Sequence, residues 1–174
     1  KQVSSKNVTV LSAPYIEIPL HEGNYHVQHA WPGDLKGNGS FDYVLSRLPQ
    51  SSGSPVVEAY LNDGTFLWRM DMGPNSISRL SSFGENDPPP ASISGFGNVA
   101  GFRDNDNMTV YDLDCDGKAE VLARTAAGVV FGDGRTLEHS NNYDQFLSVI
   151  DGSSGKEISR TPLPEDFKDD GPMG

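Results

Sequence analysis

The sequence predicts an all-β protein built from β-propeller blades, and three observations support this. The periodic segments are short and of strand type: Tyr15–Leu20 alternates between apolar and polar residues, and Phe41–Leu48 is also expected to be a strand. The 19 glycines and 12 prolines favour many turns over long helices. A unit of strand, loop and strand followed by a hairpin occurs twice, which is typical of propeller blades.

The remaining strands are expected in six short segments separated by turns. Asn62–Thr65 and Asp151–Gly155 contain Asp-Gly steps, which favour tight hairpin turns. Residues 74–107 are rich in Ser, Pro and Gly and are expected to form a long irregular insertion. The six strands are Val56–Leu61, Phe66–Met70, Met108–Tyr111, Ala119–Ala123, Phe146–Ile150 and Glu157–Arg160.

Composition excludes several classes of protein. With 13 basic and 24 acidic residues the formal charge is −11, so no basic surface is available to neutralise nucleic-acid phosphates. No apolar run approaches the roughly 18 residues of a membrane span. One cysteine, Cys115, cannot form an internal disulfide framework.

Three Asn-x-Ser/Thr sequences, at Asn7, Asn38 and Asn107, predict a secreted, extracellular glycoprotein. Chance occurrence in a polar sequence is the alternative. The polar start Lys1–Ser5 is not a signal peptide, so we expect either a mature chain or a piece of a longer one.

An acidic repeat carries the clearest chemistry. The segment Gly33–Asp42 recurs 78 positions later as Tyr111–Glu120. In the second copy, oxygen ligands stand at alternate positions 1, 3, 5, 7 and 9, and Gly117 at position 6 allows a sharp turn. This pattern predicts a calcium site, with a solvated acidic turn as the alternative. The expected ligands are Asp112, Asp114, Asp116, the main-chain carbonyl of Lys118, and Glu120.

The first copy predicts a weaker site. Asp34, Asn38 and Asp42 hold positions 1, 5 and 9, and the carbonyl of Ser40 holds position 7. Lys36 stands at position 3 and has no lone pair for a cation. We therefore expect an empty or weaker site, with the Lys36 ammonium near the position of the ion.

Six segments together resemble a known family, and the run from Glu58 to Asn75 is the most specific part. The segments are Pro14–Leu20, Gly33–Leu35, Val57–Asn75, Tyr111–Val121, Arg124–Gly128 and Ile150–Lys156. The sequence resembles the rhamnogalacturonan lyases of polysaccharide lyase family 11 over most of residues 14–160.

The resemblance implies an eight-bladed β-propeller with several calcium ions. It also implies β-elimination in the alternating rhamnose–galacturonate backbone of pectin. Because the family's members are several times longer, residues 1–174 would be the N-terminal portion of the propeller domain. They would form about two blades with an insertion at 74–107, and their partner would be the remainder of the same propeller.

The sequence departs from the family at three places. Cys115 stands where the family usually has Gly, and Lys36 interrupts the first acidic loop. The insertion replaces a short segment that contains a His in the family. No catalytic or substrate-binding residue is therefore carried over from the resemblance.

Elimination at a uronate requires a base for the C5 proton and positive charge beside the carboxylate, which calcium or Arg and Lys can supply. Arg79, Arg103 and His139 are the candidates for these roles, although each is also typical of a solvated loop. We thus expect a calcium-assisted rhamnogalacturonan lyase. The alternatives are a non-catalytic, calcium-braced propeller module that binds carbohydrate or protein, and a structural part of an enzyme whose catalytic residues lie elsewhere.

Overall fold

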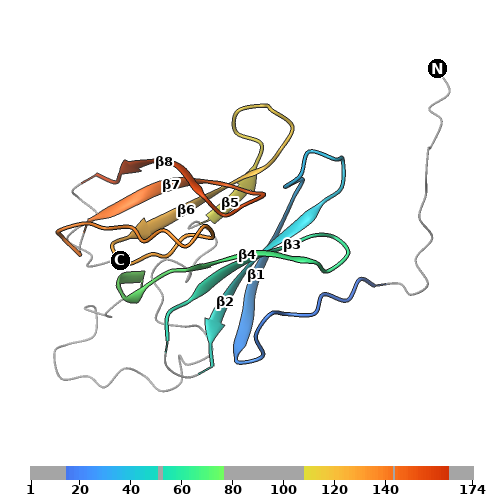
Figure 1. Cartoon of the computed structure of the whole chain (residues 1–174), viewed down its shortest axis with the longest axis horizontal. Coiled ribbons are helices and arrows are strands. Elements are labelled where there is room, and N and C mark those ends of the chain that lie inside the picture. Colours follow the sequence, from blue (N-terminus) through green and yellow to red (C-terminus); the bar gives the residue numbers. More distant parts are fainter. Residues whose placement is uncertain (1–14, 51–52, 77–107, 143, 165–174) are drawn as a thin grey trace.

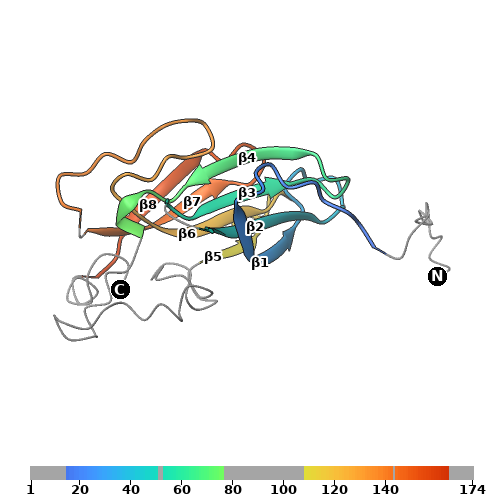
Figure 2. The same ribbon diagram turned by 90° about the horizontal axis from the view of Figure 1, so that it is seen from below.

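The computed structural model describes residues 15–50, 53–76, 108–142 and 144–164. They form two four-stranded antiparallel sheets, each with its strands in chain order (Figure 1). Seen from below, the described part of the chain is a flattened body (Figure 2). The predicted all-β, antiparallel class is therefore confirmed.

The first sheet contains one strand that the sequence did not predict. Its strands are β1 (Tyr25–Gly33), β2 (Asp42–Pro49), β3 (Val56–Tyr60) and β4 (Phe66–Asp71). The unpredicted strand is β1, which pairs with β2 and is interrupted by a bulge between Val27 and His29. The strand expected at Tyr15–Leu20 was wrong, because this segment lies in no strand and Pro19 lacks a donor for a ladder.

The second sheet follows the predicted strands closely. Its strands are β5 (Met108–Tyr111), β6 (Glu120–Ala126), β7 (Gln145–Asp151) and β8 (Glu157–Pro162). Gly33 pairs with Asp42 at the end of the β1–β2 ladder, and Tyr111 pairs with Glu120 at the end of the β5–β6 ladder. Each copy of the acidic repeat is thus the loop that joins the first two strands of a sheet.

The hydrophobic core lies between the two sheets. Trp68 on β4 is 3% exposed, and its indole N–H donates to the carbonyl of Gly152 in the β7–β8 turn (2.8 Å). Burial of the indole ring is stabilising, and its N–H needs a partner once it leaves water. Apolar residues of both sheets join this core, among them Val44, Val57, Met70, Val121, Ala123 and Ile150.

Main-chain hydrogen bonds also join the sheets. Asp71 and Val130 exchange two of them, at 2.9 and 2.8 Å, and so form an isolated antiparallel bridge. The side-chain amide of Asn75 donates to the carbonyl of Ala127 (2.7 Å). The end of β4 is therefore fixed against the loop that follows β6.

Helix is scarce in the described residues. They contain one short 3-10 helix, η1 (Pro74–Ser76), and no helix there is long and apolar enough to cross a membrane. The predicted insertion at 74–107 lies outside the described residues from position 77 onward. The closed ring and the number of its blades remain predictions.

A buried ion pair supports the outer face of the first sheet. The guanidinium of Arg47 donates to Glu58 Oε2 (2.6 Å), and both side chains are fully buried. The hydroxyl of Tyr60 donates to the same oxygen (2.6 Å), and burial together with this bond raises the pKa of Tyr60 to about 12. Tyr60 in turn accepts the main-chain N–H of His21 (2.9 Å), which holds the N-terminal segment on the sheet.

We expect Gly152→Ala to destabilise the inter-sheet contact. A Cβ at position 152 would lie 2.0 Å from the carbonyl oxygen of Ala119, beside it at the end of the second sheet, and 2.9 Å from Leu35 of the first acidic loop, so both the main chain there and the inter-sheet contact would have to shift. The expected loss is about 1–3 kcal/mol of unfolding free energy, the usual range for overpacking. Thermal or denaturant unfolding of the full protein measures it. Gly23→Ala is the matched control, because an added Cβ there meets nothing within 4 Å, and an equal effect of both changes would contradict this packing.

Candidate metal centre

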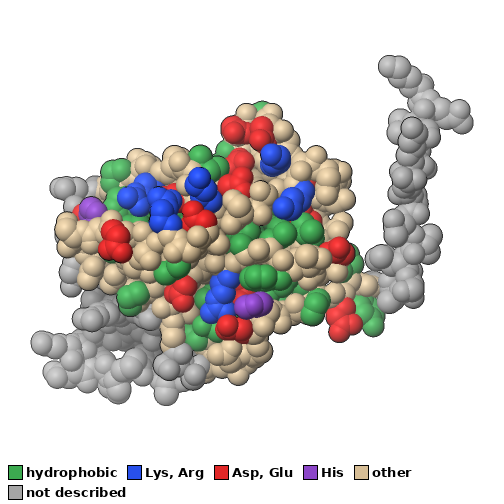
Figure 3. Space-filling model, in the orientation of Figure 1, with side chains coloured by type: hydrophobic (Ala, Val, Ile, Leu, Met, Phe, Trp, Pro, Cys, Tyr) green, Lys and Arg blue, Asp and Glu red, His purple; other side chains and the backbone are tan. Residues whose placement is uncertain are grey.

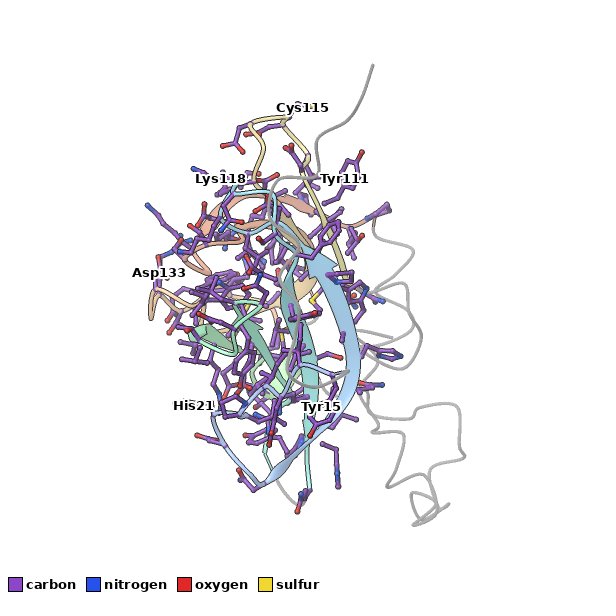
Figure 4. All side chains as sticks on the ribbon, turned by 90° about the vertical axis from the view of Figure 1, so that its right-hand side faces the viewer. Tyr15, His21, Tyr111, Cys115, Lys118 and Asp133 are labelled. Carbon is purple, nitrogen blue, oxygen red and sulfur yellow. The ribbon has the colours of Figure 1, made fainter. Side chains whose placement is uncertain are left out.

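The β5–β6 loop brings three of the predicted ligands together. One carboxylate oxygen from each of Asp112, Asp114 and Asp116 lies within 4.8 Å of the other two. The loop projects from one end of the sheet, with Cys115 at its tip (Figure 4), and acidic side chains gather there on the surface (Figure 3). The sequence spacing therefore does place these carboxylates in one cluster.

Asp112 organises the main chain of this loop. Its Oδ1 accepts the N–H of Asp116 (3.1 Å), and its Oδ2 accepts the N–H of Gly117 (3.0 Å). Gly117 has a φ of 92°, and Cys115 has a φ of 63°. Two left-handed residues therefore curl the loop, which lets alternate side chains point to the same side.

The carboxylate cluster has the chemistry of a hard-cation site. Like unit charges about 4 Å apart repel by about 1 kcal/mol in water and about 4 kcal/mol at an effective dielectric of 20. Lys118 is an exposed counter-charge, with its Nζ 4.0 Å from Asp116 Oδ2. The donor set consists of oxygen, which is what Ca²⁺ and Mg²⁺ select. These residues fit a calcium ion, because a cation would remove the repulsion among them.

Glu120, the ligand predicted at position 9, lies at the base of the loop. It is 6% exposed, and its Oε2 accepts the main-chain N–H of Leu113 (2.8 Å). The acid at this position thus ties the start of the loop to β6. Its role as a metal ligand stays a prediction.

The first loop, between β1 and β2, has the same main-chain design. Asp34 accepts the N–H groups of Asn38 (3.0 Å) and Gly39 (2.6 Å) through its two oxygens. Gly37 and Gly39 have φ values of 66° and 82°, in the places of Cys115 and Gly117. Partial desolvation acts to raise the pKa of Asp34, but the loop amides outweigh it and lower that pKa below its usual value.

The side chains of the first loop differ from those of the second. Within the described residues, the first loop has no cluster of three carboxylates, and Lys36 is exposed without an ion pair within 4.0 Å. Asp42 is 1% exposed and accepts the N–H of Asn62 (3.0 Å). Burial raises the pKa of Asp42, and its Oδ2 has no hydrogen-bond partner. A cation would satisfy that oxygen. The weaker site predicted from Asp34, Asn38, Ser40 and Asp42 stays a prediction.

The two acidic loops touch each other, which spacing in the sequence does not reveal. The N–H of Ala119 in the second loop donates to the main-chain carbonyl of Asp34 in the first (2.8 Å). A Cβ at Gly37 would lie 3.0 Å from the Lys118 side chain and 3.2 Å from the carbonyl oxygen of Gly117. Leu35, fully buried, reaches Gly152 of the second sheet. The first loop is therefore part of the inter-sheet contact.

Of the candidate base and cationic residues, one is described. His139 Nε2 lies 2.5 Å from Asp144 Oδ2, and its ring meets the Phe146 ring edge-on with centroids 5.1 Å apart. This pair lies outside the β5–β6 loop, just before the start of β7. Arg79 and Arg103 lie outside the described residues.

We expect Cys115→Gly to preserve or raise stability, because Cys115 occupies the left-handed region. That conformation costs an L-residue roughly 1–2 kcal/mol, whereas glycine adopts it freely. The larger conformational entropy of glycine in the unfolded state offsets about 0.4–1 kcal/mol of this gain, so the expected net stabilisation is about 0–1.6 kcal/mol. Cys115→Val, with a branched Cβ, is expected to destabilise the full protein in the same unfolding assay. Stabilisation by Val relative to Gly would contradict the loop conformation.

The relatives that comparison with known proteins finds are rhamnogalacturonan lyases. No family model matches the chain. The rhamnogalacturonan endolyase YesW of Bacillus subtilis is 27% identical, over 91% of this chain and 27% of its own length. The rhamnogalacturonan exolyase YesX of the same organism is 26% identical, over 89% of this chain and 27% of its own. The chain thus spans about a quarter of the length of these relatives.

Solved structures agree with the sequence matches. A Bacillus licheniformis rhamnogalacturonan lyase PL11 superposes with a TM-score of 0.68 at 25% identity, covering 90% of this chain and 28% of that one. The crystal structure of YesW gives 0.61 at 28% identity, covering 80% and 23%. The predicted relationship is confirmed: in sequence and in fold, this chain resembles one part of the rhamnogalacturonan lyases.

Proposed function

We propose that this chain is part of an enzyme that cleaves the rhamnogalacturonan backbone of pectin by β-elimination. The observation that supports this most strongly is the similarity to an endolyase and an exolyase over about nine-tenths of the chain. A four-stranded antiparallel sheet is also the repeating unit of a propeller, and the described residues form two such sheets in succession. We propose that they are two blades of that ring, with the remainder of the propeller as their partner.

The most specific family segment has a structural role in this proposal. The run from Glu58 to Asn75 contains three residues with long-range contacts. Glu58 forms the buried ion pair with Arg47, the Trp68 indole N–H donates to Gly152, and the Asn75 amide donates to the carbonyl of Ala127. The Trp68 and Asn75 contacts join one sheet to the next, and the ion pair joins β2 to β3 within the first sheet. We therefore propose a structural role in the enzyme for the described residues, and we assign no catalytic base or substrate-binding residue to them.

We further propose that calcium binds the loop of Asp112, Asp114 and Asp116, with the carbonyl of Lys118 and Glu120 as the remaining predicted ligands. A bound calcium ion would supply positive charge to an acidic protein whose substrate is also acidic. The chain's own contribution is to hold the three carboxylates together through the amides of Asp116 and Gly117. Extracellular secretion belongs to the same proposal, because pectin lies outside cells.

The proposed activity predicts unsaturated products. The full protein, incubated with calcium and rhamnogalacturonan, is expected to raise ultraviolet absorbance as elimination forms a double bond in the new terminal uronate. Homogalacturonan is the substrate control and is expected to give no rise. A chelator is expected to abolish the signal, and calcium to restore it.

Other products would contradict the proposal in distinguishable ways. Saturated products would indicate hydrolysis. Binding of the polymer without any product would support the non-catalytic, calcium-braced module.

The calcium proposal predicts a cation-dependent gain in stability. Calcium at 100 times its Kd is expected to stabilise the full protein by about 2.7 kcal/mol if it binds the folded state alone. Asp114→Asn keeps an oxygen for the N–H of Asp116 but removes one charged ligand, so a higher calcium concentration should be needed for the same rise in Tm. Asp133→Asn is the matched control, because Asp133 accepts the N–H of Arg135 in another exposed turn. An unchanged calcium response in Asp114→Asn would contradict this site.

A further inference from the structure

Asn38 and Gly39 form the one Asn-Gly step in the sequence. Both residues are exposed, in the loop between β1 and β2. Gly39 has a φ of 82°, and a Cβ at this position would meet nothing within 4 Å. Glycine therefore puts no side chain beside the main-chain nitrogen that follows Asn38, and no side chain packs over the Gly39 Cα. An asparagine in such a place can lose its side-chain amide by attack of that nitrogen.

Asp34 opposes this attack. Its Oδ2 accepts the N–H of Gly39 at 2.6 Å, and its Oδ1 accepts the N–H of Asn38 at 3.0 Å. The nitrogen of Gly39 attacks only after losing its proton, and this proton is held in the hydrogen bond to Asp34 Oδ2. The carboxylate therefore holds the reactive nitrogen in its unreactive, protonated form.

The Asn38 side chain is itself held in place. Its Oδ1 accepts the main-chain N–H of Ser40 at 2.9 Å, so the side chain folds back over its own main chain. The second loop makes the same contact, from Lys118 N–H to Asp116 Oδ1, with a carboxylate in place of the amide. Loss of the amide at position 38 would thus convert the first loop toward the charge pattern of the second.

We propose that Asn38 is a site of spontaneous side-chain amide loss and that Asp34 sets its rate by holding the amide proton of Gly39. In this reaction the deprotonated Gly39 nitrogen attacks Asn38 Cγ. The Cγ–Nδ2 bond breaks, and the side-chain nitrogen takes up a proton and leaves as ammonia. Water then opens the five-membered succinimide ring to aspartate or isoaspartate, with no change in oxidation state.

Two outcomes for the loop follow from the two ways in which the ring opens. Aspartate places a carboxylate at position 5, as in Asp116, and gives Asp34 and Asp42 a third acidic neighbour. In isoaspartate the main chain runs through the side-chain carbon. The N–H groups of residues 38 and 39 are then no longer spaced so that Asp34 can accept both. The first product retains the loop and the second disrupts it.

The test is ageing of the full protein in chelator-treated buffer at mildly alkaline pH. Peptide mass spectrometry follows replacement of the amide by an acid, and an isoaspartate-specific methyltransferase detects isoaspartate. A synthetic peptide of residues 33–43 gives the unrestrained rate. The wild-type protein is expected to react more slowly than this peptide. Asp34→Asn is expected to react roughly 10- to 100-fold faster than wild type, the range for loss of one hydrogen bond to a charged acceptor.

Matched measurements separate this effect from unfolding. Asp63→Ser is the control, because Asp63 accepts the N–H of Thr65 in another exposed turn and a serine before Gly64 creates no second Asn-Gly step, so the rate at Asn38 should stay unchanged. Hydrogen exchange should show Gly39 losing protection in Asp34→Asn while β2 keeps its own. A wild-type rate equal to that of the peptide, an unchanged rate in Asp34→Asn, or equal loss of protection in β2 would overturn the proposal.

Discussion

The contact between the two sheets is the constraint on which the rest of the structure depends. Trp68 and Leu35 of the first sheet enter the second beside Gly152, where no side chain could be accommodated. The Asp34 carbonyl accepts the N–H of Ala119, so this contact includes both acidic loops. The positions of the predicted ligands are therefore set by packing between sheets as well as by the loop that carries them.

Much of this architecture can be predicted from the sequence, because strands and turns leave local patterns. Alternation and Asp-Gly turns predict β2 to β4 and β5 to β8 within one or two residues at most ends. β1 escapes prediction because its bulge and its half-exposed residues erase the alternation. Tyr15–Leu20 alternates, but it lies in no strand and passes beside the turn at Gly64.

The candidate metal site could likewise be predicted from the sequence only in part. The spacing of Asp112, Asp114 and Asp116 predicts their convergence, because a loop that curls around one point turns alternate residues inward. The left-handed conformation of Cys115 could not be predicted from its residue type, which usually avoids that region. Contact between the two loops depends on tertiary packing, so no local pattern encodes it.

A crystal structure of the full protein grown with calcium is the measurement that tests the account most directly. We expect these two sheets to be consecutive blades of a closed ring. We also expect anomalous density for calcium among Asp112, Asp114 and Asp116. An open arrangement of the sheets, or carboxylates turned apart with no ion in saturating calcium, would contradict the account.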